Sequence, residues 1–222
     1  ALGNLTEHGF HVTTWTGRVA AGYARVNDLD ALETVEDDVV VEAAHVVFPE
    51  LNVSVPEAWN RPAGWSGSVP AGDDVVVGII DSGIDVTHPS LRTPAGTTRV
   101  VRLWDQAIHA AAPGPPAAYP YGGEWDSAAI DAYLLPVMTP FSARVTGHGT
   151  AVAGVAASNG QAAPVGRYVG VAPSADLIVV ALDAHRGAFP STANVVNAVE
   201  YVFDVADALG KRAVVNLSQG AQ

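Results

Sequence analysis

The sequence of 222 residues contains no cysteine, and this absence excludes several kinds of chemistry. Without thiols, the chain can form no disulfide, hold no metal ion through thiolates and use no cysteine nucleophile. The absence does not decide between an oxidising and a reducing compartment, because a chain without cysteine is compatible with either.

Basic side chains are also scarce. The chain has 11 lysines and arginines against 23 aspartates and glutamates, which gives a formal net charge of −12. A protein that binds nucleic acid through its charge needs clustered lysine and arginine to meet the phosphates. We therefore expect no nucleic-acid partner.

Long apolar runs are missing as well. The longest, such as Val75 to Ile80, have the length of a strand, whereas a membrane-spanning helix needs roughly 20 apolar residues. We therefore expect no membrane partner. The first ten residues have neither a basic start nor a continuous apolar stretch, so we expect that a secretory signal was removed or that the protein is cytoplasmic.

The negative charge is concentrated in the first third of the chain. Residues 1–74 hold 12 acidic and 3 basic side chains, an asymmetry that often marks a separate N-terminal unit. Within it, residues 8–47 have the pattern of a small α/β domain. The expected elements are strands at HVTTW and VAAGYARV, a helix from about Leu29 to Val35 started by Asn27 and Asp28, and a β-branched run at residues 39–47.

A linker is expected next, because residues 49–74 are rich in proline, glycine, serine and tryptophan. We predict a small domain at residues 1–48, a linker at 49–74 and a second domain at 75–222.

The second domain shows the strand and helix order of an α/β fold with a parallel sheet covered on both faces. The expected elements are strands at 75–80, 175–182 and 212–218, a small-residue helix at 147–158, and a helix at 192–209 capped by Ser191 or Thr192 and ended by Gly210. Between Arg99 and Val145 lies an insertion rich in proline, glycine and aromatic residues, in which we find no clear periodicity.

Two residues of this domain are candidates for chemistry. Asp81 follows the apolar run directly, and ligands and catalytic groups gather at the carboxyl ends of parallel strands. His148 lies between two glycines at the start of a helix, and histidine serves as a base near neutral pH. A capping aspartate and a surface histidine are the plainer alternatives. His88 with Asp81 and Asp85 could suggest a metal site, but their spacing matches no ligand motif.

Four ordered segments resemble the subtilase family of serine proteases. They are VVVGIIDSGIDVTHPSL, GHGTAVAG, GVAPSADLIVVAL and AVVNLSQG, and they span residues from about 75 to the C-terminus. The resemblance implies a three-layer subtilisin-like domain in which Asp81 and His148 are the acid and base of a Ser/His/Asp triad. It also implies that Ser218, Gln219 and Gly220 form the edge that pairs with an extended peptide or protein substrate.

The resemblance further implies what surrounds this site. Residues 8–47 resemble the inhibitory prosegment of the family, with a permanent N-terminal domain as the alternative. The LWDQ and YGGEW stretches resemble a bacterial subgroup. No cofactor is needed for the chemistry, structural calcium is plausible because carboxylates are in surplus, and secretion is favoured over a cytoplasmic location.

Two departures from the family pattern stand out. Ala151, expected to face the core, replaces a second histidine that many members have. More seriously, the sequence has no Gly-Thr-Ser-Met-Ala-like segment with the nucleophile, and Ser82 and Ser218 are poor substitutes. We therefore expect the N-terminal half of a catalytic domain, which without its C-terminal half cleaves no peptide.

Two alternatives stay open. The chain could be a subtilase-fold module that binds peptides without catalysis. It could also be a sugar-kinase or actin-like ATPase, in which an aspartate and a glycine follow a buried strand. GHGTAVAG counts against the ATPase, because that fold gives no reason for a histidine between glycines at a helix start.

Overall fold

The computed structural model describes residues 2–16, 19–32, 35, 47–49, 71–108, 113–135, 143, 145–162, 165, 168–182 and 191–221. The helices are α1 (Leu2–Glu7), α2 (Leu29–Leu32), α3 (Ser127–Leu134), α4 (Gly147–Ala157) and α5 (Thr192–Ala208), with short 3-10 helices η1 (Val26–Asp28) and η2 (Pro89–Leu91). The strands are β1 (His11–Thr16), β2 (Val19–Tyr23), β3 (Val47–Pro49), β4 (Val75–Asp81), β5 (Val100–Asp105), β6 (Gly123–Asp126), β7 (Asp176–Ala181), β8 (Arg212–Leu217) and β9 (Gln219–Ala221).

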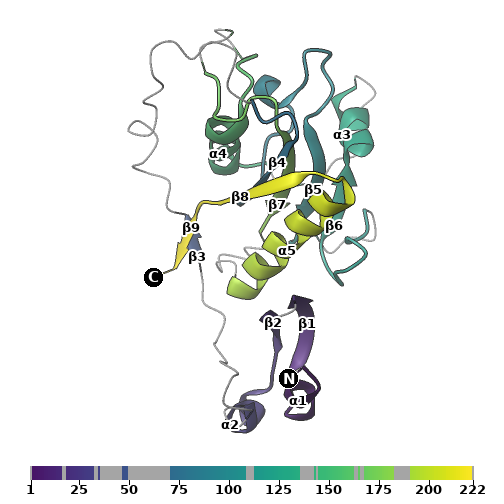
Figure 1. Cartoon of the computed structure of the whole chain (residues 1–222), viewed down its shortest axis with the longest axis vertical. Coiled ribbons are helices and arrows are strands. Elements are labelled where there is room, and N and C mark those ends of the chain that lie inside the picture. The colour runs from purple at the N-terminus through teal and green to yellow at the C-terminus, as the bar shows by residue number, and fades with distance from the viewer. Residues whose placement is uncertain are drawn as a thin grey trace.

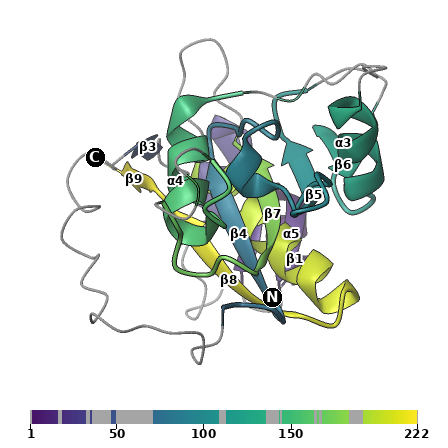
Figure 2. The ribbon, with the colours of Figure 1, turned by 90° about the horizontal axis from the view of Figure 1, so that it is seen from above.

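A five-stranded sheet forms the centre of the predicted second domain. Its strand order is β6-β5-β7-β4-β8, and all neighbouring pairs are parallel except β5 and β6. Helices α3 and α4 cover one face and α5 covers the other (Figures 1 and 2). The predicted α/β class, with a parallel sheet between two helical layers, is therefore confirmed.

Strand β4 lies inside this sheet and explains the uninterrupted apolar run. Every residue from Val76 to Asp81 is buried, because β7 and β8 flank the strand and helices cover both faces. Val77 and Ile79 point to the layer of α4, whereas Val76 and Ile80 point to α5. A side chain at Gly78 would come within 2.6 Å of Val202 on α5, so the glycine allows this helix to pack closely.

Helix α5 forms as the sequence predicts. Ser191 is the N-cap and forms a capping box with Asn194, in which each side chain bonds to the backbone of the other residue. The chain turns at Gly210, whose φ of 67° is readily adopted by glycine.

Buried Arg99 holds the far end of α4. Its guanidinium donates to the carbonyl oxygens of Ala157 at 2.7 Å, Ala175 at 2.7 Å and Ser90 at 3.2 Å. Burial lowers the pKa of Arg99, and the charge of Asp176 opposes this shift in part. Three segments that are distant in sequence thus share one cation.

The stretch between Arg99 and Val145, in which the sequence shows no clear periodicity, contains regular elements. This stretch contributes β5, β6 and α3, and β5 occupies a position inside the sheet between β6 and β7. Neither β5 nor the four-residue β6 alternates clearly between polar and apolar residues. Aromatic packing stabilises them instead, because Trp104 is fully buried against Tyr119, Tyr121 and Tyr201.

The N-terminal unit contains the predicted hairpin. Strands β1 and β2 pair antiparallel, and Leu5, Leu32 and Val35 form a small core. Of the expected helix from Leu29, α2 covers Leu29–Leu32, and Asn27 and Asp28 lie in η1 before it. The predicted β-branched run at 39–47 falls outside the described residues except for Val47. The hairpin lies below α5 in Figure 1, and the side chains of Thr14 and Asn197 are hydrogen-bonded across this contact.

The last strands connect the N-terminal unit to the sheet. β8 ends at Leu217, one residue earlier than expected, and β9 follows it. β3 pairs antiparallel with β9, with Phe48 opposite Gly220 and Pro49 opposite Gln219. In the described part of the chain, no helix has the length and apolar character to cross a membrane.

Candidate functional site

Asp81 is the last residue of β4 and lies at the carboxyl edge of the sheet. Its side chain is completely buried, yet three donors meet Oδ1. The Ser82 amide donates at 2.7 Å and the Ser82 hydroxyl lies at 3.0 Å, while His148 supplies the third contact. A buried carboxylate needs such donors, because it has lost its hydration.

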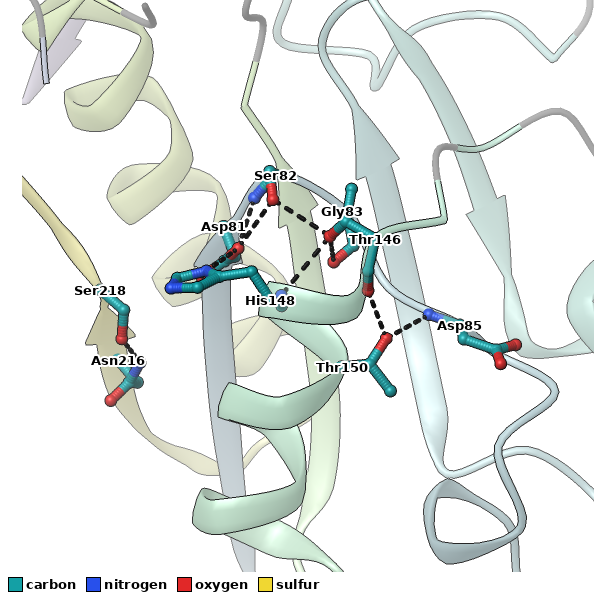
Figure 3. Close-up of polar contacts among 10 residues, drawn as sticks. Asp81, Ser82, Gly83, Asp85, Thr146, His148, Thr150, Asn216 and Ser218 are labelled. Carbon is teal, nitrogen blue, oxygen red and sulfur yellow. Dashed lines mark hydrogen bonds and ion pairs between the residues drawn. The ribbon is translucent and has the colours of Figure 1, made fainter. Parts of the chain in front are cut away.

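His148 is the second residue of α4, and its ring lies against this carboxylate (Figure 3). Nδ1 is 2.8 Å from Oδ1 and 3.0 Å from Oδ2 of Asp81. The predicted contact between residues 67 positions apart is therefore confirmed. A carboxylate only accepts hydrogen bonds, so the proton of the neutral imidazole is assigned to Nδ1 and the lone pair to Nε2.

The other ring nitrogen has no hydrogen-bond partner among the described residues. Nε2 of His148 is buried as an atom, although 29% of the side chain is exposed. A buried polar atom without a partner costs free energy unless a further group meets it. With its lone pair there, the imidazole can accept a proton from a hydroxyl placed next to it.

Gly149 allows the aspartate and the histidine to meet. A Cβ at this position would lie 2.0 Å from the carbonyl oxygen of Gly83 and 3.1 Å from Cβ of Asp81. No larger residue fits unless the helix start moves away from the loop after β4. Sterically, this site therefore requires a glycine at the position after His148.

Two threonines at the start of α4 are hydrogen-bonded to the loop after β4, and the sequence analysis did not identify them. Thr146 is the N-cap of α4, and its hydroxyl donates to the Gly83 carbonyl at 3.0 Å. Thr150 accepts from the Asp85 amide at 2.8 Å and donates to the Thr146 carbonyl at 2.6 Å. The preference for threonine at a helix N-cap was a usable signal for Thr146, but nothing local indicated its partners.

The predicted substrate residues lie beyond the end of β8. Ser218 connects β8 to β9, which contains Gln219 and Gly220. The Ser218 hydroxyl accepts a hydrogen bond from Asn216 at 2.8 Å, and Figure 3 shows both side chains across from the ring of His148. Ser82 is engaged by Asp81 and Thr146, at 3.0 Å from each.

One expectation about a neighbouring residue does not hold. Ala151 is exposed rather than core-facing, since it lies on the outer side of α4. Near the site, Asp85 accepts from the amide and hydroxyl of Thr87, and His88 accepts from the Ser90 amide. In the described ranges, no three carboxylate or imidazole groups come together to hold a metal ion, so the expected calcium sites stay a prediction.

Comparison with known proteins finds a similar sequence and a similar fold. The subtilisin-like protease SBT2.4 of Arabidopsis thaliana is 27% identical over 188 residues, which cover 76% of this chain and 22% of that protein. The solved CspB protease of Clostridium perfringens has the same fold, with a TM-score of 0.53 at 22% identity over 73% of this chain and 31% of that one. The chain thus spans less than a third of these relatives. The bacterial assignment of the insertion stays a prediction.

A family model provides the assignment itself. The model of the subtilase family matches residues 72–222, which include β4, α4 and both residues of the Asp81–His148 contact. The match begins inside the stretch predicted as a linker and does not decide the proposed domain limits. By this match the chain belongs to the subtilase family.

Proposed function

We propose that residues 72–222 supply the acid and the base of a subtilisin-type serine endopeptidase. The observation that carries this proposal is the buried Asp81 carboxylate on Nδ1 of His148, with Nε2 left without a partner among the described residues. In this mechanism Nε2 takes the proton of a serine hydroxyl as the serine attacks a peptide carbonyl. Asp81 holds the ring in the required tautomer and stabilises the imidazolium that forms.

The proposal places the nucleophile in a segment that this sequence does not contain. The Ser82 hydroxyl is hydrogen-bonded to Asp81, and the Ser218 hydroxyl accepts a hydrogen bond from Asn216. Neither serine is hydrogen-bonded to Nε2 of His148. We therefore propose that the catalytic domain is completed by a downstream half carrying a Gly-Thr-Ser-Met-Ala-like segment, and that the present chain alone is inactive.

The proposed substrate site is the backbone of Ser218, Gln219 and Gly220. Supporting this assignment, strand β9 already pairs with an extended segment, the chain's own β3. A peptide substrate would pair in the same manner, since strand addition needs only free main-chain donors and acceptors. The proposed substrates are accordingly peptides or proteins in extended form.

The same pairing supports an inhibitory role for residues 1–48. Val47, Phe48 and Pro49 occupy the strand position that a substrate would need. The N-terminal hairpin also contacts α5 through Thr14 and Asn197. In the proposed protease this unit blocks the site until it is removed, and the protein is secreted.

Serine labelling tests the proposal. The 222-residue chain and a version extended by its natural downstream sequence are treated with a serine-directed phosphonate and with a peptide substrate. We expect labelling and hydrolysis only for the extended protein, and loss of both with His148→Ala. Hydrolysis by the 222-residue chain that Ser218→Ala abolishes would contradict the proposed division of the triad.

The second candidate function is a peptide-binding module without catalysis. The β3–β9 pairing favours it equally, because strand pairing does not depend on a nucleophile. An extended protein that binds peptides but takes up no phosphonate would support this alternative.

A further inference from the structure

The hydroxyl of Thr146 lies between the two halves of the site. It is 3.0 Å from the Ser82 hydroxyl, 3.0 Å from the Gly83 carbonyl oxygen and 3.4 Å from the Gly149 amide. Ser82 and Gly83 belong to the loop after β4, whereas Gly149 belongs to α4. The Ser82 hydroxyl in turn is 3.0 Å from Oδ1 of Asp81.

The number of protons limits which of these bonds exist together. Each hydroxyl carries one proton and can donate only once. If Ser82 donates to Asp81, the bond between the hydroxyls needs the proton of Thr146, and the Gly83 carbonyl loses its donor. If Ser82 instead donates to Thr146, Thr146 can donate to Gly83, but Asp81 loses the Ser82 proton. When the two hydroxyls share no bond, Ser82 donates to Asp81 and Thr146 donates to Gly83, so at Asp81 this case is the same as the first.

These two arrangements differ at the oxygen that faces His148. In the first, Oδ1 of Asp81 accepts from the Ser82 amide, the Ser82 hydroxyl and Nδ1 of His148. In the second, only the amide and the imidazole donate to it. With fewer competing donors, the carboxylate is a stronger acceptor for the imidazole. The direction of the Ser82 proton therefore decides how strongly Asp81 holds His148, and the Thr146 hydroxyl is the alternative acceptor for that proton.

We propose that Thr146 is a positioning residue that acts through the Ser82 hydroxyl on the Asp81–His148 pair. This proposal rests on the proposed function, because positioning matters for catalysis only if the pair acts on a serine. The Thr146 hydroxyl is hydrogen-bonded to Ser82, Gly83 and Gly149 rather than to Asp81 or His148, so its influence has to pass through Ser82 or through the start of α4.

NMR on the 222-residue chain labelled with ¹⁵N-histidine tests the proposal without any need for activity. The Nδ1 proton of His148 is identified by its loss in His148→Ala. We expect Thr146→Val to shift or abolish this signal and Thr146→Ser, which keeps the hydroxyl, to preserve it. Ser191→Ala is the matched control, since it removes the N-cap of α5 on the opposite face of the sheet and should leave the signal unchanged.

A double-mutant cycle separates the route through Ser82 from a loss of helix capping. Ser82→Ala alone should shift the signal, and adding Thr146→Val should then shift it no further. Additive shifts, or an unchanged signal in Thr146→Val, would overturn the proposal. If the valine variant does not fold, Thr146→Gly removes the same hydroxyl at an N-cap where glycine costs little, and the same outcomes apply.

Kinetics of the extended protein supply the second measurement. Thr146→Val should lower kcat about ten- to a hundredfold and leave KM unchanged, because misplacement of an acid–base pair slows the chemical step. An extended protein without hydrolysis would end the proposed function, while the NMR result would still decide the role of Thr146. An unaltered kcat beside normal hydrolysis would overturn the positioning role alone.

Discussion

At the scale of single residues, the site depends on the glycine after the histidine. The closest atom to a Cβ at Gly149 would be the Gly83 carbonyl oxygen, which belongs to the backbone and cannot rotate away. The loop after β4 and the start of α4 therefore touch main chain to main chain, and the side chains of Asp81 and His148 bridge them from the side.

Substitution of this glycine tests the close approach. We expect Gly149→Ala to lower the free energy of unfolding by about 1–3 kcal/mol, because the methyl group overpacks the contact with Gly83. Gly154 is the control in the same helix, since a Cβ there meets nothing within 4 Å. Gly154→Ala should raise the free energy of unfolding by about 0.5–1 kcal/mol, as is usual for glycine to alanine inside a helix. Urea titrations give both values, and equal stability of the two variants would contradict the steric account.

At the scale of elements, β3 and β9 form a two-stranded sheet that is separate from the central sheet and from the N-terminal hairpin. The pairing involves three residues on each side, and it joins the two predicted domains at their ends. A short two-stranded pairing contributes little stability alone, so we expect it to exchange readily with a competing strand.

Limited proteolysis tests whether the N-terminal unit is a removable segment. If residues 1–48 are the proposed inhibitory segment, the first cleavage should fall between about Ala44 and Asn60, on either side of β3, because such a segment is joined by a protease-sensitive linker. Mass spectrometry of early products should show two fragments. Cleavage first within residues 10–40, with this linker intact, would indicate a permanent N-terminal domain.

At the scale of the whole molecule, the layers are held together by aromatic packing between the sheet and α5. Tyr201 on α5 is buried and donates to Glu124 of β6 at 2.6 Å, and buried Tyr119 packs edge-on against it. Burial raises the pKa of Tyr201, and the hydrogen bond and charge of Glu124 add to the shift. Burial also raises the pKa of Tyr119, with a contribution from Asp204 and Glu200.

These shifts predict how stability depends on alkaline pH. A tyrosine whose folded pKa lies above the ordinary value of 10.0 favours folding fully below pH 10, and this contribution is lost as the pH rises further. We expect tyrosinate absorbance and the loss of circular dichroism to develop together above about pH 10. Tyr201→Phe should raise the pH at which circular dichroism is lost, so that tyrosinate absorbance and unfolding no longer develop together. Complete ionisation of all six tyrosines with an unchanged circular dichroism spectrum would contradict the burial argument.

The sequence by itself determined the class of the fold and two residues of the site, Asp81 and His148. The apolar run of β4, the helical period of α5 with its Ser191 cap, and the glycines around His148 are local patterns, and local patterns record burial and chain direction. Asp81 and His148 followed from them, because a strand end and a helix start are identified by their neighbours in the chain.

Only the tertiary structure decided what depends on distant contacts. The strands β5 and β6 escaped prediction because their stability comes from Trp104 packing against tyrosines of other segments. Other features also join residues that are far apart in the chain. They are the hydrogen bonds that lead from Thr146 through Ser82 to Asp81, the close approach in which a Cβ at Gly149 would lie 2.0 Å from the Gly83 carbonyl oxygen, and the pairing of β3 with β9. A residue type limits which bonds a side chain can make, but the partner that it meets is set by the packing of the layers.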